Sequence, residues 1–276
     1  MVANAKVSVL MGIYNCEKTL YDAINSIINQ TYFNWELILC DDGSKDTTFF
    51  IAKEFQMLYP EKIILLSNEK NIKLAATLNR CLKYAKGDYI ARMDSDDISL
   101  ENRLEVQCNF LDNNLMYDLV GSSVLPFDEN DKTRGIRIYK EKPQKQDLKY
   151  GTPFAHPTIM MRKEAIKELK GYSESSDCFR CEDLELWIRF YKSGRKGYNL
   201  KVPLLKYREG RIDYRRRNLQ DALRISKLTR LGINQLGMNK VNFIFSLKPI
   251  IRALLPSSIV RIIHNMKLKS IDEVKI

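Results

Sequence analysis

Three carboxylates lie within four residues in Asp94-Ser95-Asp96-Asp97, directly after the short apolar run of residues 89–93. Like charges this close repel one another, so a fold gathers them where a cation or hydrogen-bond donors hold them. Carboxylate oxygens suit hard ions such as Mg²⁺ and Mn²⁺, and Mg²⁺ commonly binds through carboxylates together with substrate phosphates. One interpretation is therefore a metal site that holds a phosphorylated substrate. An acidic turn that caps the next helix explains the four residues equally well, because Asp is common at caps and turns.

The sequence around these carboxylates alternates between short apolar runs and helical patterns. Strands are expected at residues 6–13, 35–40, 62–66 and 88–93, and helices at 18–30, 47–58 and 72–85. This alternation predicts βαβ units and a mainly parallel central sheet flanked by helices. In such sheets ligands bind beyond the carboxyl ends of the strands. Asp41-Asp42 and Asp94-Ser95-Asp96-Asp97 both follow strands, which favours a binding site over a plain turn.

From residue 100 to residue 210 the pattern is less regular. Further helices are expected at 101–113, 163–169 and 182–193, and further strands at 118–127, 134–139, 158–161 and 202–207. The strands at 118–127 and 134–139 are separated by a polar turn, which is typical of a hairpin.

The positive charge of the chain is concentrated in its last quarter. The formal net charge is +11, and residues 201–276 hold 17 Lys and Arg against 5 Asp and Glu. Residues 214–230 read as a basic helix, and residues 241–269 combine large apolar side chains with scattered basic ones. That mixture favours an amphipathic segment at a membrane surface over a helical extension packed on the main domain or on a second copy of the chain.

Other features restrict the compartment and the chemistry. The first residues lack the pattern of a signal peptide, and no apolar run is long enough to span a membrane, so a cytoplasmic location is expected. Of the six cysteines, Cys178 and Cys181 have C-x-x-C spacing. Without a second pair, that spacing is weak support for a zinc or redox site.

Four motifs occur in the order that they take in one enzyme family. They are Val7-Ser8-Val9-Leu10-Met11-Gly12-Ile13-Tyr14-Asn15, Asp41-Asp42-Gly43-Ser44-Lys45-Asp46, Ala91-Arg92-Met93-Asp94-Ser95-Asp96-Asp97, and Glu182-Asp183 followed by Trp187. Through them the chain resembles family 2 inverting glycosyltransferases over residues 6 to about 210. The resemblance implies the α/β GT-A fold, in which nucleotide-diphospho-sugars bind, over residues 1–210. A donor half would cover about 1–100 and an acceptor half about 101–210, and residues 211–276 would form a basic helical C-terminal extension.

The resemblance also implies an activity. It is the metal-dependent transfer of one sugar from a nucleotide sugar, with UDP the expected nucleotide, to a lipid-linked or polysaccharide acceptor. The Gln-x-x-Arg-Trp motif of processive members is missing, since the only tryptophans are Trp35 and Trp187. A non-processive enzyme of bacterial capsule, O-antigen or lipooligosaccharide biosynthesis is therefore expected. Its extension would rest on the anionic inner face of the cytoplasmic membrane, and a homo-oligomer is also compatible with the sequence.

Roles for individual residues follow from the resemblance. Backbone around Ile13 and Tyr14 would line the pocket for the base, and Asp42 would accept a hydrogen bond from it. Asp94 would meet the ribose, and Asp96, with Asp94 beside it and Ser95 between them, would hold the Mn²⁺ or Mg²⁺ that bridges the phosphates.

Catalysis is assigned by the same resemblance to Glu182-Asp183. Asp183 would be the general base that takes a proton from the acceptor hydroxyl, and Glu182 would orient it or raise its pKa. A helix N-terminus favoured by negative charge is the plain alternative for this pair.

Further donor contacts are expected from Asn71, Lys73 and Arg80. Asn71 opens a segment in which family members usually have glycine at the position of Lys73, so Lys73 either reaches a phosphate or is simply solvated. Arg80 and Arg92 are candidate partners for phosphate or carboxylate groups. His156 is either a loop histidine bonded to backbone or a contact to the acceptor or the metal.

Two other functions stay open at the level of the sequence. Arg215-Arg216-Arg217 could belong to a nucleic-acid-binding arm, although no recognised nucleic-acid-binding module accompanies it and no nucleic acid partner is expected. A nucleotidyltransferase would share carboxylates at strand ends. It would, however, need a glycine-rich phosphate loop, which the first strand lacks.

Overall fold

An eight-stranded sheet forms the centre of the molecule in the computed structural model, which describes residues 5–210, 218–266 and 268–270. Its order is β3-β2-β1-β4-β7-β6-β8-β5. The strands are β1 (Val7–Ile13), β2 (Trp35–Asp41), β3 (Ile63–Ser67), β4 (Tyr89–Arg92), β5 (Ile98–Ser99), β6 (Leu119–Phe127), β7 (Met160–Arg162) and β8 (Gly197–Arg208). Strands β1 to β4 are parallel, and β7 runs antiparallel between β4 and β6. The expected α/β architecture is confirmed.

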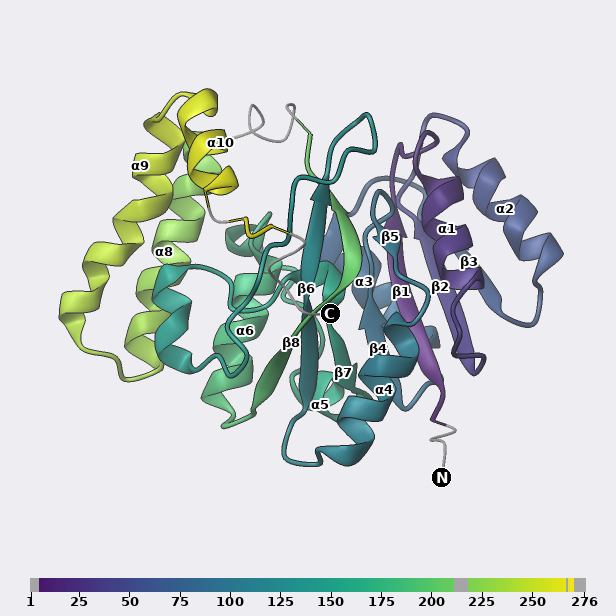
Figure 1. Cartoon of the computed structure of the whole chain (residues 1–276), viewed down its shortest axis with the longest axis horizontal. Helices are drawn as coiled ribbons and strands as arrows, with labels where there is room; N and C mark the ends of the chain where they lie inside the picture. Colours follow the sequence, from purple (N-terminus) through teal and green to yellow (C-terminus); the bar gives the residue numbers. More distant parts are fainter. Residues whose placement is uncertain (1–4, 211–217, 267, 271–276) are drawn as a thin grey trace.

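Helices cover both faces of the sheet (Figure 1). They are α1 (Leu20–Ile28), α2 (Thr48–Leu58), α3 (Leu74–Tyr84), α4 (Arg103–Asn113), α5 (Lys163–Glu168), α6 (Glu182–Lys192), α8 (Leu219–Gln235), α9 (Lys248–Leu254) and α10 (Ser257–Asn265). Short 3-10 helices are η1 (Lys145–Tyr150), η2 (His156–Thr158), η3 (Ser176–Cys178) and η4 (Lys240–Leu247). None of the helices in the described ranges is both long and apolar enough to cross a membrane.

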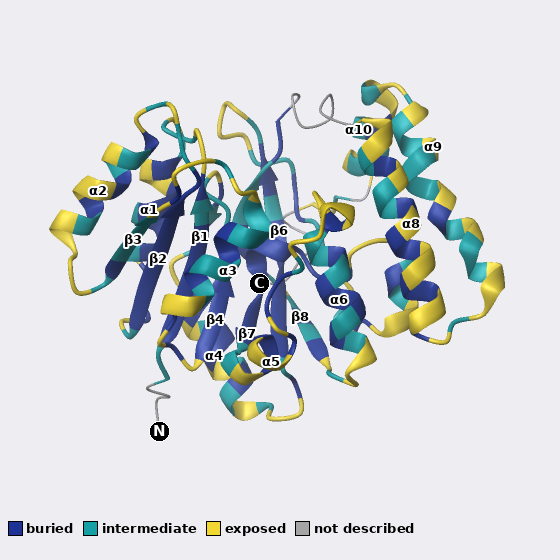
Figure 2. Cartoon of the chain, turned by 180° about the vertical axis from the view of Figure 1, so that it is seen from behind, coloured by how far each residue is buried: buried dark blue, intermediate teal, exposed yellow. Residues whose placement is uncertain are grey.

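The apolar run of β1 is continuous because both faces of this strand are covered. Val9 and Met11 face one core together with Ile24 of α1, whereas Leu10 faces a second core together with Leu78 of α3. Successive side chains of a strand point to opposite faces, so a strand covered on both faces is apolar at nearly every position. The strands of the sheet are accordingly the most buried part of the chain (Figure 2).

The predicted strand at 134–139 is wrong. Among the described residues, this segment has one isolated bridge to β6, between Arg137 and Val124, and Ile136 bridges Lys269 instead. Gly135 explains the interruption, because its φ is +132° and a Cβ atom there would lie 2.6 Å from the carbonyl oxygen of Lys269. Such a glycine interrupts a regular ladder.

Other elements also differ from the prediction. Strand β5 was not predicted, and its two residues pair with the end of β8. Thr158 belongs to η2, so β7 begins only at Met160. Strand β8 begins earlier than the expected 202–207.

The C-terminal helices pack beside α6, on the side of the molecule away from α1 and α2 (Figure 1). Helix α8 lies against α6 at Gly232, where a Cβ atom would come within 2.8 Å of Ile188. The predicted basic helix 214–230 corresponds to α8, and its residues 214–217 lie outside the described part of the chain. The predicted amphipathic segment 241–269 is divided among η4, α9 and α10.

Glu209 fastens this part of the chain to the sheet. It accepts ion pairs from Arg134 and Arg137 at 2.7 and 2.8 Å, and His264 of α10 lies 3.4 Å away. Burial by itself would raise the pKa of Glu209, but His264 and the two arginines outweigh it and lower the pKa to about 2. The carboxylate therefore stays charged and holds the end of β8 to α10.

Candidate active site

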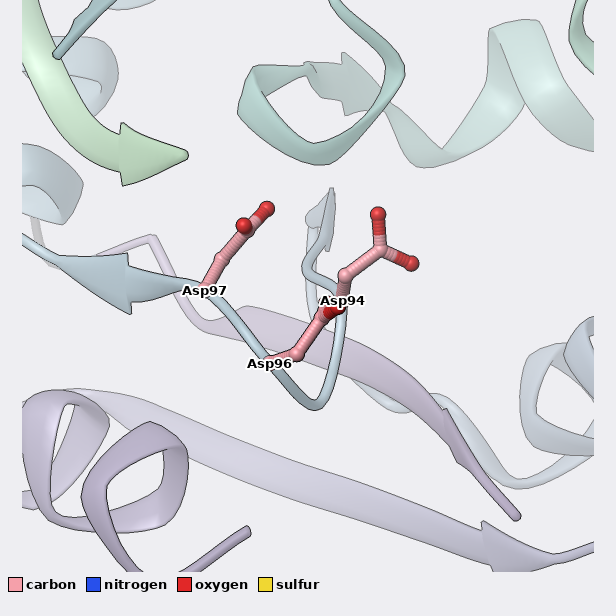
Figure 3. A group of neighbouring side chains, drawn as sticks. All are labelled: Asp94, Asp96 and Asp97. Carbon is pink, nitrogen blue, oxygen red and sulfur yellow. The ribbon is translucent and has the colours of Figure 1, made fainter. Parts of the chain in front are cut away.

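The turn between β4 and β5 carries the three carboxylates (Figure 3). Oxygen atoms of Asp94, Asp96 and Asp97 all lie within 4.8 Å of one another. Asp97 is 1% exposed, and its Oδ1 accepts a hydrogen bond of 2.8 Å from the backbone N of Arg208. Its Oδ2 is buried without a hydrogen-bond partner. Burial, followed by the charges of Asp94 and Asp96, raises the pKa of Asp97 well above its usual range.

This arrangement fits a divalent cation. A buried carboxylate oxygen without a donor, beside two further carboxylates, gains most from a metal ion. The reading of Asp97 as a helix cap is wrong, because β5 follows it directly and Asn102 occupies the N-cap position of α4.

Arg92 lies behind the turn and pairs with Asp94. Its buried guanidinium donates to both carboxylate oxygens of Asp94. Burial would lower the pKa of Arg92, but the charge of Asp94 and its hydrogen bond raise it. The sequence left Arg92 between a structural and a phosphate-binding role, and the structure shows that it orients Asp94.

Asp42 organises the loop that follows β3. Its carboxylate accepts hydrogen bonds from Asn68 Nδ2 at 2.9 Å, from Ile72 N at 2.8 Å and from Lys73 N at 3.0 Å. The backbone N of Asp42 donates to the carbonyl of Ile13 at 2.9 Å. Ile13 at the end of β1 and Asp42 after β2 are thus adjacent to each other, and Asp42 also contacts the start of α3. The side chain of Tyr14, next to Ile13, is 46% exposed.

Lys73 begins α3 with φ +75°. Few residues other than glycine adopt this conformation without strain, which gives a physical reason for the glycine that is usual there. Asn71 Oδ1 accepts from Lys73 N at 3.2 Å, and Lys73 Nζ lies 5.5 Å from the ring centre of Phe179. Arg80 donates to the carbonyl of Ser67 at 2.7 Å and to Asn68, so it holds the end of β3.

Glu182 and Asp183 occupy the first turn of α6. Burial, and then the charge of Asp183, raises the pKa of Glu182 to about 7. Burial raises the pKa of Asp183 as well, although Leu184 N donates to its Oδ1 at 2.7 Å and the charge of Arg92 opposes the rise. The two carboxyls thus interact electrostatically, and the charge of Asp183 adds to the rise in the pKa of Glu182.

His156 is buried against Tyr172. The distance between His156 Nε2 and the Tyr172 hydroxyl is 2.9 Å. Burial, and then the charge of Arg92, lowers the pKa of His156 well below its usual range. The carboxylate group in the described part of the chain consists of Asp94, Asp96 and Asp97, so His156 lies outside it. Tyr172 was not singled out from the sequence, because a lone tyrosine after a helix carries no pattern.

A cavity of about 650 Å³ opens beside Asp183. Its walls come from η1, the start of α6, the end of β8 and the C-terminal helices α8, α9 and α10. Asp183 and Tyr207 are among its lining residues. This cavity could not be predicted from the sequence, because a pattern of apolar and basic residues does not show which side of a short helix faces the protein.

The chain is similar to known proteins in sequence. The sequence model described as Glycosyl transferase family 2 matches residues 8–170. "Putative glycosyltransferase EpsE" of Bacillus subtilis (strain 168) is 44% identical over 273 residues, which cover 99% of this chain and 98% of that protein. "UDP-Glc:alpha-D-GlcNAc-diphosphoundecaprenol beta-1,3-glucosyltransferase WfgD" of Escherichia coli is 46% identical over 112 residues, or 40% of this chain and 43% of that protein.

Solved structures show a similar fold. S. aureus TarS 1-349 in complex with UDP has a TM-score of 0.67 at 19% identity and covers 90% of this chain and 71% of that one. Mannosyltransferase PcManGT from Pyrobaculum calidifontis in complex with GDP-Man and Mn²⁺ has a TM-score of 0.62 at 15% identity. The match covers 95% of this chain and 80% of that one. The fold is therefore of the GT-A type that the motifs implied.

Proposed function

Because the chain belongs to glycosyl transferase family 2, we propose that it transfers a single sugar, with metal assistance and inversion, from a nucleotide sugar to a lipid-linked or polysaccharide acceptor of a surface glycan. Membership of this family favours this activity over the nucleic-acid-binding and nucleotidyltransferase interpretations. UDP is the nucleotide that we expect, since TarS is described with UDP and WfgD is named for a UDP-linked donor.

The observation that carries the proposal is the buried, unpartnered Oδ2 of Asp97 beside Asp94 and Asp96. We propose that Asp96 and Asp97 bind the metal and that Asp94, held by Arg92, faces the ribose. When bound, Mn²⁺ or Mg²⁺ stabilises the negative charge that develops on the departing diphosphate. Asp42, Ile13, Tyr14 and the Asn71–Lys73 loop would surround the base. PcManGT, which has a similar fold, is described with a nucleotide sugar and Mn²⁺ together.

Asp183 is the proposed general base. A base must reach the acceptor hydroxyl and must have a pKa suited to accepting its proton. Asp183 meets the second condition, because burial raises its pKa. Asp183 can reach the acceptor hydroxyl if the acceptor occupies the adjacent cavity, because Asp183 forms part of the cavity wall.

The extension is the proposed contact with a membrane. The described residues of η4, α9 and α10 expose large apolar side chains, among them Val241, Ile244, Leu254, Ile262 and Met266, each more than half exposed. Together with the net +12 of residues 201–276, this surface suits the anionic inner leaflet. We propose that residues 1–210 form the catalytic unit and that residues 211–276 bring it to this leaflet.

The test is a panel of nucleotide sugars with and without Mn²⁺ or Mg²⁺. Thermal unfolding measures binding, and release of the free nucleotide measures turnover. One donor is expected to raise the unfolding temperature only when metal is present, because ligand that binds the folded state alone stabilises it. If no nucleotide sugar raises the unfolding temperature with either metal, the proposed function is wrong.

A further inference from the structure

Tyr207 lies where the carboxylate turn and the cavity meet. The residue after it, Arg208, bonds the turn at Asp96 and at Asp97. Tyr207 itself lines the cavity, whose wall also includes Asp183. The last residues of β8 therefore connect the two parts of the proposed site, because one holds the carboxylate turn and the other borders the cavity of the proposed general base.

The ring of Tyr207 is held in place, but its hydroxyl is not engaged by the protein. The side chain packs against the core that contains Val124 and Leu205, and the backbone of Tyr207 pairs with Pro126 of β6. Within the described part of the chain the hydroxyl makes no hydrogen bond, and it is not one of the polar atoms sealed in the core. Polar groups of a folded protein normally have a partner in the protein or in the solvent. The hydroxyl of Tyr207 is therefore free to bond a ligand in the cavity.

The surroundings of Tyr207 keep its hydroxyl protonated. Burial, and then the charges of Asp97 and Asp94, raise the pKa of Tyr207 well above its usual range. The hydroxyl can therefore both donate and accept a hydrogen bond at physiological pH, and it does not compete with Asp183 as a base. A neutral group with both capacities suits the hydroxyl groups of a sugar, which also donate and accept.

The reaction places the transferred sugar between the diphosphate and the acceptor. The anomeric carbon is bonded to a diphosphate oxygen, which lies near the carboxylate turn if the metal is bound there. The same carbon is attacked by the acceptor hydroxyl, whose proton Asp183 would take. A side chain that is close to the turn and borders the cavity of Asp183 is therefore beside this sugar. Tyr207 meets both conditions.

We propose that Tyr207 is a specificity-determining residue whose hydroxyl forms a hydrogen bond with a hydroxyl group of the transferred sugar. The inference rests on the proposed function and names a residue that selects the sugar at the same site. A site that bonds one substrate hydroxyl discriminates against sugars in which this hydroxyl is missing or points elsewhere, because the polar group of the site then loses its partner.

The experiment compares the full-length wild type with Tyr207→Phe, which removes the hydroxyl and keeps the ring. Because the hydroxyl makes no hydrogen bond to the described protein, both proteins should unfold at the same temperature. Calorimetric titration in Mn²⁺ measures the binding of UDP, UDP-glucose, UDP-galactose and UDP-N-acetylglucosamine. UDP should bind equally to both proteins. The UDP sugar that the wild type binds most tightly should bind Tyr207→Phe about three- to tenfold more weakly, the usual effect of one hydrogen bond between uncharged groups.

The matched control is Tyr198→Phe, the same substitution on the same strand. Tyr198 bonds Glu141 at 2.7 Å, and the described residues that line the cavity do not include it. This variant should bind all four compounds like the wild type. The inference is wrong if Tyr207→Phe binds the preferred sugar as tightly as the wild type does, or if Tyr198→Phe shows the same loss. Equal losses for UDP and for the UDP sugars in Tyr207→Phe would also overturn it, because they would indicate a structural role.

Deoxy analogues of the preferred UDP sugar, each without one sugar hydroxyl, locate the partner of Tyr207. One analogue should bind the wild type and Tyr207→Phe equally, because the hydrogen bond is then absent from both. If every analogue still distinguishes the two proteins, the hydroxyl of Tyr207 does not bond a sugar hydroxyl and the inference is wrong.

Failure of the inference and failure of the proposed function give different results. If both proteins bind UDP and the UDP sugars equally, the inference fails and the proposed function stands. If the panel selects another nucleotide, the same comparison is made with that nucleotide and its sugars. If the wild type binds no nucleotide sugar of the panel with either metal, the proposed function fails and the inference fails with it.

Discussion

Asp97 and Arg208 are joined although 111 residues separate them in the chain. Arg208 N donates to Asp97 Oδ1 and Arg208 Nε donates to the carbonyl of Asp96, each at 2.8 Å. The guanidinium lies 4.4 Å from the ring centre of Phe127, which fixes it in place. The end of β8 therefore helps to set the shape of the carboxylate turn, and it leaves the second oxygen of Asp97 buried without a hydrogen-bond partner.

Asp96→Ala is predicted to abolish metal-dependent donor binding without loss of fold. Asp96 is exposed, so its removal leaves no cavity in the core, but it takes away a ligand of the proposed metal. Calorimetric titration of the donor with and without Mn²⁺ measures the effect. Asp22→Ala, on the exposed face of α1, is the control. Metal-dependent binding that survives in Asp96→Ala would remove Asp96 from the site.

Asp183→Asn is predicted to bind donor normally and to lose transfer by about 10²- to 10⁴-fold, because an amide cannot accept the proton of the acceptor hydroxyl. In the wild type, the rate should fall as the pH falls through the raised pKa of Asp183, since only the carboxylate acts as a base. Steady-state transfer and donor titration separate the two effects. Asp177→Asn, at an exposed ion pair with Lys227, is the matched control. Near-normal turnover by Asp183→Asn would disprove the assignment.

Glu182→Gln is predicted to stabilise the protein at high pH. The folded pKa of Glu182 is about 7, above the ordinary 4.5, so the folded state holds this proton more tightly than the unfolded state. The stability from the protonated form is complete below about pH 4.5 and is lost as the pH rises through about 7. Between pH 5 and pH 8 the free energy of unfolding of the variant should therefore rise by roughly 1–3 kcal/mol relative to that of the wild type.

Urea unfolding at several pH values measures this gain. Glu164→Gln, an exposed residue of α5, should parallel the wild type at every pH. A constant difference between Glu182→Gln and the wild type from pH 5 to pH 8 would contradict the prediction.

Lys73→Gly is predicted to be more stable than Lys73→Ala by about 1 kcal/mol. Both variants remove the same side-chain contacts, but only glycine relieves the strain of φ +75°. Urea unfolding of the two proteins gives the difference directly. At Lys70, whose φ is not positive, the same pair of substitutions should show no advantage for glycine. Equal stability of the two variants at Lys73 would mean that the backbone is not strained there.

The double variant Ile251→Ser/Leu254→Ser is predicted to weaken binding to vesicles that contain anionic lipid. Removing two exposed apolar side chains from α9 reduces the area that can enter the interface. Co-sedimentation with the vesicles measures the fraction of protein bound. Leu115→Ser/Met116→Ser removes side chains that are 80% and 60% exposed elsewhere on the molecule, and should bind like the wild type. If both double variants lose vesicle binding equally, α9 is not a specific membrane-binding surface.

Local sequence patterns were sufficient to predict most elements of residues 5–92. Strands β1 to β4 are apolar on both faces, and α1 and α3 have one apolar stripe, so their positions follow from periodicity. Strand β5 could not be found this way, because two residues carry no period. The segment 134–139 looks like a strand in sequence, but the need for glycine at 135 comes from the distant Lys269.

The site was predictable only in part, because it too depends on contacts between residues far apart in the sequence. The acidic residues were visible because strand ends precede them, whereas the partners that tune them come from far along the chain. Nothing near Asp97 in sequence indicates that Arg208 satisfies one oxygen and leaves the other without a donor. The direction in which α9 faces depends on its packing beside α8 and η4, which its own seven residues do not encode.

The position of β7 between β4 and β6 also has a consequence for synthesis of the chain. Strand β4 is complete at Arg92, but the partner that covers its outer edge begins only at Met160. During translation the ribosome therefore holds a chain whose first four strands are paired and whose sheet still ends in an open edge. Open edges recruit other strands, so messages truncated between these two points should yield aggregated protein, and messages that extend beyond β7 should yield much less.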